Sequence, residues 1–317
     1  MSCTFDNRSY INPIATGADP YILYWDGMYY LYSTNAVNEG YKVFTSIDMS
    51  EWTDRGFCLK KEDVYCDPMD NKGFWAPEVY YYNGKFYMIY TVNEHIGIAT
   101  ADSPLGPFAS EKHGFINDNE REIDGHLFFD DDGRVYIYFV RCGSNIGDGI
   151  GNEIFGAEFD MNTFTYKNEK CLLYPQPHTW EWIGDHGYVA EGPYVLKHKG
   201  RYYLTYSANG FGSKDYAIGV AISDSPLGTY EKYKGNPILK KNISRDIYGT
   251  GHHSFTVSPD GTETFIVYHR HASSECVIPR KTCVDRCYFV YDKEHSYDVL
   301  KVDGPTNTYQ PCPSGVK

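Results

Sequence analysis

Three carboxylates in this chain of 317 residues open aromatic-rich segments, and they are the side chains best suited to chemistry. The segments are D-P-Y-I-L-Y-W from Asp19, D-G-H-L-F-F from Asp124 and E-G-P-Y-V-L from Glu191. Hydrolysis of a glycosidic bond needs a carboxylic acid to protonate the leaving oxygen and a carboxylate to activate water or attack the sugar carbon. A third carboxylate can keep the pKa of the acid near the working pH. Taken singly, the two aspartates could be turn residues, whereas glutamate is a poor turn former. The chemistry therefore depends on a fold that brings all three together.

A repeated pair of strands supplies such a fold. Its first copy, D-P-Y-I-L-Y-W-D-G-M-Y-Y-L-Y-S-T, alternates on both sides of an Asp26-Gly27 turn, which is a strong β-hairpin signal. Related copies begin at Ala76, Ile123, Ala190 and Gly251. The copies start about 46 to 67 residues apart, a length typical of a four-stranded antiparallel blade with its loops. We therefore expect an all-β fold, a five-bladed β-propeller of four-stranded antiparallel blades, as a single domain over residues 1–317.

The composition agrees with an all-β protein and limits its partners. Aromatic residues make up 17% of the chain, and 30 Gly and 16 Pro favour strands and tight turns over helices. The formal net charge is −13, and no cluster of Lys and Arg could follow a phosphate backbone. We therefore expect neither nucleic acid nor an anionic membrane as a partner. Surplus acid serves solubility and also suits a neutral ligand such as a sugar.

The cysteines and the first residues indicate a compartment. The nine Cys include no C-x-x-C pair and no spacing typical of a zinc site, so we interpret them as reduced thiols. The start, M-S-C-T-F-D-N-R-S-Y, has no basic region followed by an apolar run, and no apolar stretch approaches the roughly 18 residues of a membrane span. We expect a soluble cytoplasmic protein, although a chain from which a signal peptide had been removed would look the same. The oligomeric state stays open.

In a propeller the first strand of each blade lines the central channel, so residues that open the five copies should converge. The converging residues would be Asp19, Glu78, Asp124, Glu191 and either His252 or His253. Crowded carboxylates destabilise a fold through repulsion and lost hydration unless function or a bound cation compensates. The sequence therefore predicts a cluster of acids at the channel. The alternative to catalysis is a propeller that only binds carbohydrate or protein.

Four motifs around these residues resemble glycoside hydrolase family 43, in the same order and over nearly the entire chain. They are N-P-I-A-T-G-A-D-P, which ends at Pro20, F-W-A-P-E-V from Phe74, E-I-D-G-H-L-F-F-D-D-D-G around Asp124 and V-A-E-G-P-Y-V around Glu191. Each motif alone is short, and their order and blade spacing make the set specific. The resemblance implies inversion at the anomeric carbon, with Asp19 as general base and Glu191 as general acid. Asp124 would orient the acid and raise its pKa.

The resemblance also implies residues that contact the sugar. Trp75, with its neighbour Phe74, would line the sugar subsite, although an aromatic ring there could equally pack between blades. Arg280, in V-I-P-R-K-T-C-V-D-R, would reach hydroxyls of the substrate, and the alternative is a surface arginine paired with the acidic exterior. Trp180 and Trp182 lie on an expected loop at the channel face and could shape a distal subsite, which the sequence leaves unassigned.

His252, in G-T-G-H-H-S, matches the family residue that lies in the channel, often near a bound calcium ion or water cluster. The resemblance thus implies a structural calcium ion in the channel with His252 beside it, while the chemistry itself requires no cofactor. A histidine that only hydrogen-bonds neighbouring strands is the alternative. His253 would point inward instead if the strand register differed by one residue.

The substrate follows only from the resemblance. It implies release of a terminal pentose, β-D-xylose or α-L-arabinofuranose, from short plant-cell-wall oligosaccharides. An endo-arabinanase or a galactosidase is the alternative within the family. A phosphorylase on a related fold would need a basic phosphate site near the carboxylates, and we identify none. The chain ends soon after the fifth copy, so we expect no C-terminal β-sandwich of the kind that long β-xylosidases of the family carry.

Overall fold

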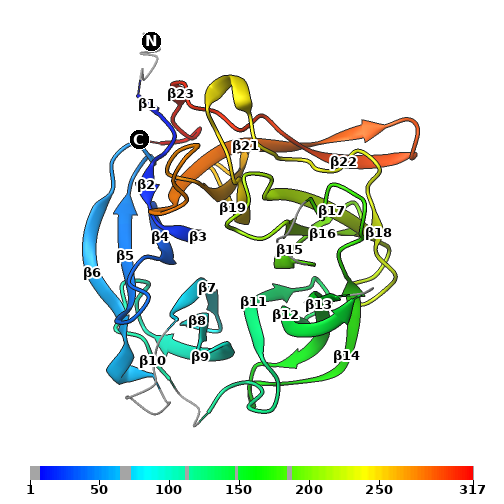
Figure 1. Ribbon diagram of the computed structural model, residues 1–317. Coiled ribbons are helices and arrows are strands. Elements are labelled where there is room, and N and C mark those ends of the chain that lie inside the picture. The colour runs from blue at the N-terminus through cyan, green and yellow to red at the C-terminus, as the bar shows by residue number, and fades with distance from the viewer. Residues whose placement is uncertain (1–7, 65–72, 111–113, 147–148, 184–187, 317) are drawn as a thin grey trace.

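The computed structural model describes residues 8–64, 73–110, 114–146, 149–183 and 188–316, and its regular structure is almost entirely β. Five sheets stand around a central axis like the blades of a propeller (Figure 1). Within these ranges the helices are two single turns, η1 (Lys61–Asp63) and η2 (Ile243–Arg245), and no helix is long and apolar enough to cross a membrane. The prediction of an all-β, five-bladed propeller with antiparallel four-stranded blades is confirmed.

Within each blade the strands follow one another outward from the centre as antiparallel neighbours. The first blade contains β3 (Ala18–Trp25), β4 (Met28–Thr34), β5 (Gly40–Ser46) and β6 (Thr53–Lys60), and the second contains β7 (Trp75–Tyr82), β8 (Lys85–Val92), β9 (His95–Ala101) and β10 (Ala109–Ser110). The third blade contains β11 (Glu122–Phe129), β12 (Val135–Ile146), β13 (Gly149–Asp160) and β14 (Thr165–Leu173). The fourth blade contains β15 (Ala190–His198), β16 (Arg201–Ala208), β17 (Ala217–Ser223) and β18 (Glu231–Lys232). The inner strands, β3, β7, β11 and β15, are therefore the ones that surround the axis (Figure 1).

The fifth blade closes the ring with an additional strand from the beginning of the chain. It contains β19 (Gly251–Val257), β20 (Thr264–Arg270), β21 (Lys281–Asp292) and β22 (Tyr297–Val302), and β2 (Ala15–Thr16) pairs with the first residues of β21. A small outer sheet joins β1 (Ser9–Tyr10) to β23 (Gln310–Pro311). This blade therefore holds one strand more than the expected four, because the early segment joins it before entering the first blade.

Tight turns set the hairpins that the sequence indicated. The turn of Asp26 and Gly27 joins β3 to β4, and both residues have positive φ (46° and 78°), as a two-residue turn of type I′ requires. Asn83 and Gly84 repeat this geometry between β7 and β8, with φ of 47° and 87°. The turns thus fix the register of each of these inner strands against its neighbour.

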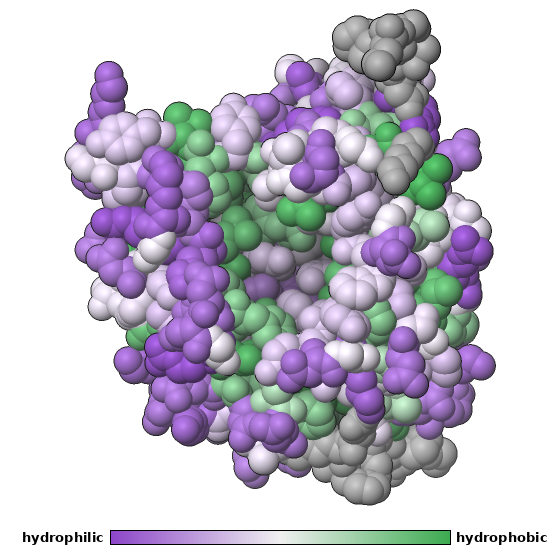
Figure 2. Space-filling model, turned by 180° about the vertical axis from the view of Figure 1, so that it is seen from behind, coloured by the Kyte–Doolittle hydropathy of each residue, from purple (hydrophilic) through white to green (hydrophobic). Residues whose placement is uncertain are grey.

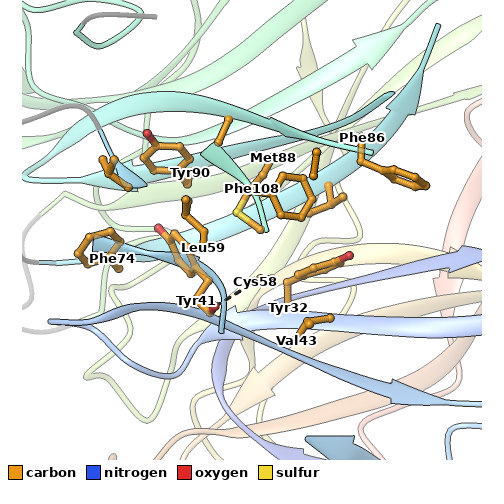
Figure 3. Packing of buried hydrophobic residues seen from close by; sticks show 14 of the residues in the cluster. Tyr32, Tyr41, Val43, Cys58, Leu59, Phe74, Phe86, Met88, Tyr90 and Phe108 are labelled. Atoms are coloured by element: carbon orange, nitrogen blue, oxygen red, sulfur yellow. Dashed lines mark hydrogen bonds between the residues drawn. The ribbon is translucent and has the colours of Figure 1, made fainter. Parts of the chain in front are cut away.

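The core lies between adjacent blades and is rich in tyrosine. Figure 3 shows the cluster between the first two blades, where Tyr32 and Tyr41 from one blade lie near Met88 and Tyr90 from the other. All four are buried, and the hydroxyl of Tyr41 donates to the backbone oxygen of Thr91 at 2.8 Å. Such a core buries aromatic area while its hydroxyls join neighbouring blades.

Each inner strand begins with a one-residue bulge, and the bulge residue has a left-handed backbone. These residues are Asp19, Ala76, Asp124, Gly192 and His252, with φ between 43° and 56°. Glycine adopts this conformation without steric cost, Asp and His tolerate it better than most residues, and Ala adopts it rarely. Four non-glycine residues at five equivalent positions indicate that the surrounding structure holds the backbone there.

Hydrogen bonds between blades hold these bulges. In four blades the bulge N–H donates to a side chain at the end of the second strand of the preceding blade: Ala76 to Thr34 Oγ1 (2.9 Å), Asp124 to Thr91 Oγ1 (3.0 Å), His252 to Ser207 Oγ (2.8 Å) and Asp19 to His269 Nδ1 (3.2 Å). In the fourth blade the Gly192 N–H donates instead to Asp124 Oδ2 at 3.1 Å. We call these five bonds the amide ring. It links each blade to the next and sets where the residues that open the inner strands can point.

Asn12 lies just before the closing strand β2 and joins it to the fifth blade. Its buried side chain accepts from the Val284 N–H at 2.8 Å and donates to the Val284 backbone oxygen at 2.8 Å and to Thr306 Oγ1 at 3.1 Å. Asn12→Ala leaves the Val284 N–H buried without its acceptor and removes one bond each from the Val284 oxygen and Thr306, so we expect the free energy of unfolding to fall by about 2 to 4 kcal/mol. Denaturant titration measures the change, with the exposed Asn119→Ala as control. A loss no larger than that of the control would contradict this account of ring closure.

Candidate active site

Three carboxylates and one histidine meet where the inner strands begin, in the middle of the ring. His252 Nδ1 lies 3.4 Å from Asp19 Oδ1 and 3.9 Å from Asp124 Oδ2. Glu191 directly precedes Gly192, whose amide binds Asp124, and the charges of Asp124 and His252 both act on the carboxyl of Glu191. Viewed from behind, the molecule is hollowed at the centre of the ring (Figure 2). The fold thus brings together the three acids that open the first, third and fourth blades.

Asp19 is held as a carboxylate. Its Oδ1 accepts from Arg280 Nη1 at 2.8 Å, and its Oδ2 accepts from Thr34 Oγ1 at 2.7 Å. Burial opposes ionisation, but the guanidinium of Arg280 and then the imidazole of His252 outweigh it and hold the pKa of Asp19 well below its usual range. A second imidazole beside Asp19, that of His269, is neutral, because burial and the charge of Arg280 lower its pKa to about 3. Asp19 is therefore ionised at neutral pH and can act as a base.

Glu191 is held in the opposite state. Burial, and after it the negative charge of Asp124, raises the pKa of Glu191 to about 7. His252 and the hydroxyl of Tyr216, which donates to Glu191 Oε1 at 2.7 Å, act the other way and limit the rise. Gly251 leaves room for this tyrosine, because a Cβ there would lie 2.1 Å from its ring. Glu191 therefore keeps its proton up to about neutral pH.

Asp124 and His252 complete the electrostatics of the site. Burial raises the pKa of Asp124, and so does the charge of Asp19, while His252 favours the ionised carboxylate. Burial opposes protonation of His252, but the surrounding carboxylates outweigh it and raise the pKa of this histidine. His252 thus favours ionisation of all three acids, and Arg280 favours that of Asp19. Two carboxyl groups with opposed pKa shifts in one site are the arrangement that lets one group accept a proton while the other donates one.

The two aromatic residues expected to contact the sugar have different positions. Trp75 is partly exposed, and it stands directly before the bulge of its blade, as Glu191 does in the fourth blade. Phe74 is fully buried in the core between the first two blades (Figure 3). The prediction that Phe74 binds substrate is therefore wrong. Successive side chains of an extended chain point to opposite sides, so two adjacent residues do not both face the channel.

The tryptophans of the loop before β15 pack against tyrosines. Trp180 lies on Tyr206, with 5.8 Å between ring centroids, and Trp182 stacks on Tyr188 at 5.1 Å. Gly219 lies under the first of these rings, since a Cβ there would be 2.5 Å from Trp180. These contacts give both tryptophans a packing role beside the fourth blade.

Arg280 lies in the site, and its contact is with the carboxylate of Asp19. Its guanidinium also lies 4.6 Å from the ring centroid of Phe211. This phenylalanine is 46% exposed, and the buried His271 bonds its backbone oxygen through Nε2 at 2.8 Å. Phe211 therefore covers the arginine that keeps Asp19 ionised. Sequence reasoning missed this residue, because the surrounding Gly-Phe-Gly is typical of any surface loop.

Glu78 does not share the hydrogen bonds of the three acids, although its place in the repeat predicted that it would converge with them. It stands two residues beyond the bulge of the second blade, where it pairs with His126 Nδ1 at 2.9 Å and with the hydroxyl of Tyr80. His126 in turn accepts from the Val195 amide through Nε2 at 3.1 Å. The two-residue offset thus places Glu78 in a separate network that joins the second, third and fourth blades.

Of the two adjacent histidines that open β19, His252 faces the carboxylates, while His253 contacts Thr205 Oγ1 at 2.6 Å. A calcium ion takes roughly six to eight oxygen ligands. Both oxygens of Asp19 already accept from Arg280 and a threonine. Among the residues whose positions are described, no group of three or more His, Cys, Asp or Glu side chains is arranged to hold a metal ion. The side chains around His252 therefore do not fit a calcium ion.

The raised pKa of Glu191 predicts how its replacement changes stability with pH. A carboxyl with a higher pKa in the folded than in the unfolded state is not destabilising below its ordinary pKa near 4.5, and its unfavourable contribution grows as the pH rises through 7. We expect Glu191→Gln to raise the free energy of unfolding at pH 8 by up to about 3 kcal/mol and to change it little at pH 4.5. Thermal melting at both pH values measures this difference.

Asp19→Asn is the matched comparison, and its effect on stability should have the opposite sign. It removes a charge of the same kind from the same site but leaves Arg280 without its partner, so it should lower the melting temperature at pH 8. A Glu191→Gln protein that is no more stable than wild type at pH 8 would show that the surroundings do not raise the pKa of Glu191.

Comparison with known proteins identifies the family to which the chain belongs. The model of the family described as glycosyl hydrolases family 43 matches residues 10–294. A β-D-galactofuranosidase of Aspergillus niger is 28% identical over 91% of this chain and 85% of its own length. A xylosidase/arabinosidase of Butyrivibrio fibrisolvens is 30% identical over 86% of this chain, which spans 53% of that relative. The crystal structure of a thermostable family-43 glycoside hydrolase is 40% identical, with a TM-score of 0.87 over 96% of this chain and 99% of its own. The family match over most of the chain, together with the shared fold, shows that the chain belongs to glycosyl hydrolases family 43.

Proposed function

We propose that this chain is an inverting glycosidase that releases a terminal pentose, β-D-xylose or α-L-arabinofuranose, from short oligosaccharides. The observation that carries the proposal is the pair of opposed pKa shifts in one site. Asp19 is held ionised, and Glu191 is held protonated up to about pH 7. Membership of a glycosyl hydrolase family supports hydrolysis as the class of reaction.

In the proposed reaction Asp19 takes a proton from a water molecule as that water attacks the anomeric carbon. Glu191 gives its proton to the glycosidic oxygen as the carbon–oxygen bond breaks, so the sugar leaves with inverted configuration. Thr34 and Arg280 hold the two oxygens of Asp19 and keep it ionised before the attack. The negative charge of Asp124 keeps the proton on Glu191 until the leaving oxygen takes it.

The names of two relatives supply the candidate sugars. The relative from B. fibrisolvens is named a xylosidase/arabinosidase, and the one from A. niger a β-D-galactofuranosidase. The partly exposed ring of Trp75, at the same level of its blade as Glu191, offers a surface against which a sugar ring can stack. Because the A. niger relative matches this chain over most of both lengths, β-D-galactofuranose is the second candidate.

Hydrolysis of three chromogenic substrates separates these candidates. The substrates are the 4-nitrophenyl β-D-xyloside, α-L-arabinofuranoside and β-D-galactofuranoside, assayed side by side with the wild-type chain. We expect turnover of one or both pentosides. Turnover of the galactofuranoside alone would overturn the pentose assignment, and turnover of none would overturn the proposed function.

Two amide variants distinguish the acid from the base. Glu191→Gln and Asp19→Asn each remove a proton transfer with little change of volume, so each should lower kcat on a disaccharide by about 10²- to 10⁴-fold. A very good leaving group needs little protonation. Glu191→Gln should therefore recover most of its activity on a 2,4-dinitrophenyl glycoside, whereas Asp19→Asn should not. Steady-state kinetics on both substrates give the comparison, and equal losses in all four cases would reject the assigned roles.

The proposed roles also set the pH dependence of kcat/KM. Activity falls on the basic side as Glu191 loses its proton near pH 7, and on the acidic side only where Asp19 becomes protonated, well below its usual pKa range. Tyr216→Phe removes a hydroxyl that stabilises the ionised form of Glu191, so the basic limb should move to higher pH. Tyr138→Phe, which removes a buried hydroxyl bonded to Pro226, is the control. A basic limb that stays in place, or moves down, in Tyr216→Phe would contradict the role of Glu191.

A further inference from the structure

One residue interrupts the pattern of the amide ring. In each blade the residue before the bulge pairs with a residue of the second strand, and these partners are Thr34, Thr91, Val140, Ser207 and His269. Four of the five side chains accept the bulge amide of the next blade. Val140 is fully buried and has no polar atom that could do so.

The first and third blades show what this difference does. Both have an aspartate at the bulge, Asp19 and Asp124. In the first blade the hydroxyl of Thr34 stands between Asp19 and the next blade, since it donates to Asp19 Oδ2 at 2.7 Å and accepts from the Ala76 N–H at 2.9 Å. The carboxylate is thus separated from the neighbouring amide by one bridging oxygen.

In the third blade there is no such bridge. With Val140 at the corresponding place, Asp124 Oδ2 accepts directly from the Gly192 N–H at 3.1 Å. Gly192 directly follows Glu191, so this bond brings the carboxylate of Asp124 within one residue of Glu191. The Asp124 amide is also fixed, because it donates to Thr91 Oγ1. Asp124 is therefore held at both its backbone and its carboxylate.

We propose that Val140 is a positioning residue of the site: by withholding a hydroxyl, it lets Asp124 bind the amide of Gly192 and so keeps Asp124 beside Glu191. A hydroxyl at this position would bridge Asp124 and Gly192, as Thr34 bridges Asp19 and Ala76, and would hold the carboxylate of Asp124 further from Glu191. The effect on position needs only the geometry described above. The effect on rate rests on the proposed function.

The test inserts the hydroxyl. Val140→Thr replaces a methyl group by a hydroxyl of similar size, and we expect kcat on an unactivated disaccharide to fall about ten-fold, because the acid loses its nearby negative charge. On a 2,4-dinitrophenyl glycoside, which needs little protonation, the fall should stay within about two-fold. A crystal structure of the variant should show the new hydroxyl bonded to both the Gly192 N–H and the carboxylate of Asp124.

Matched variants separate this role from packing. Val140→Ser and Val140→Ala differ only by the hydroxyl, so the serine variant should show the same dependence on leaving group and the alanine variant should not. Val267→Thr places a hydroxyl at another fully buried valine of a second strand, in the fifth blade, and should leave the ratio of the two substrates unchanged.

Two results would overturn the proposal. One is a ratio of the two rates that is unchanged in Val140→Thr and Val140→Ser, or changed equally in Val140→Ala. The other is a variant structure in which Asp124 still binds the Gly192 amide directly. If the wild-type chain hydrolyses no glycoside, the proposed function fails, and the variant structure alone decides the placement of Asp124.

Discussion

The left-handed bulge at the start of each inner strand is the constraint on which the site depends. A non-glycine residue in this conformation costs about 1 to 3 kcal/mol, and the inter-blade amide bonds offset part of that cost. In return, the bulge departs from the simple alternation of a strand at the point where five blades meet. Asp19, Asp124 and His252 are therefore placed by short backbone bonds rather than by long, mobile side chains. Residues more than a hundred positions apart acquire fixed relative positions in this way.

Fixed positions alone would give three carboxyl groups with similar pKa values, and the unequal distribution of positive charge makes these pKa values differ. Among the residues that the structure describes around the site, the guanidinium of Arg280 contacts Asp19, whereas Glu191 has a tyrosine hydroxyl and the charge of His252. The carboxyl with the best compensation ionises most easily, and the one with the least retains its proton. The electrostatic repulsion among the three carboxyl groups thus acts mainly on Glu191, the group for which a retained proton is useful.

The sequence contained enough to predict the propeller and the acids, because both are repeated. The Asp-Gly and Asn-Gly turns and five copies of one hairpin indicate blades, and the residues that open the copies indicate an axis. It did not contain the register of the bulges, so it did not show that Phe74 packs in the core or that Glu78, whose charge still acts on Asp124, pairs with His126. Tyr216 and Val140 carry no motif at all. Their roles depend on which residue of a neighbouring blade they meet, which only the packed structure defines.

Asp19 and Arg280 are 261 positions apart, and Arg280 lies directly before the strand against which β2 closes the ring. The Gly17 amide donates to the backbone oxygen of Arg280 at 3.1 Å, so the partner of Asp19 arrives with the closing contact itself. On a ribosome, which makes the chain from its amino end, Asp124 and Glu191 emerge long before this guanidinium. A growing or clipped chain would therefore carry the proton donor without a fully formed acceptor. Activity in the proposed reaction would therefore begin only after β2 has paired with the fifth blade and closed the ring.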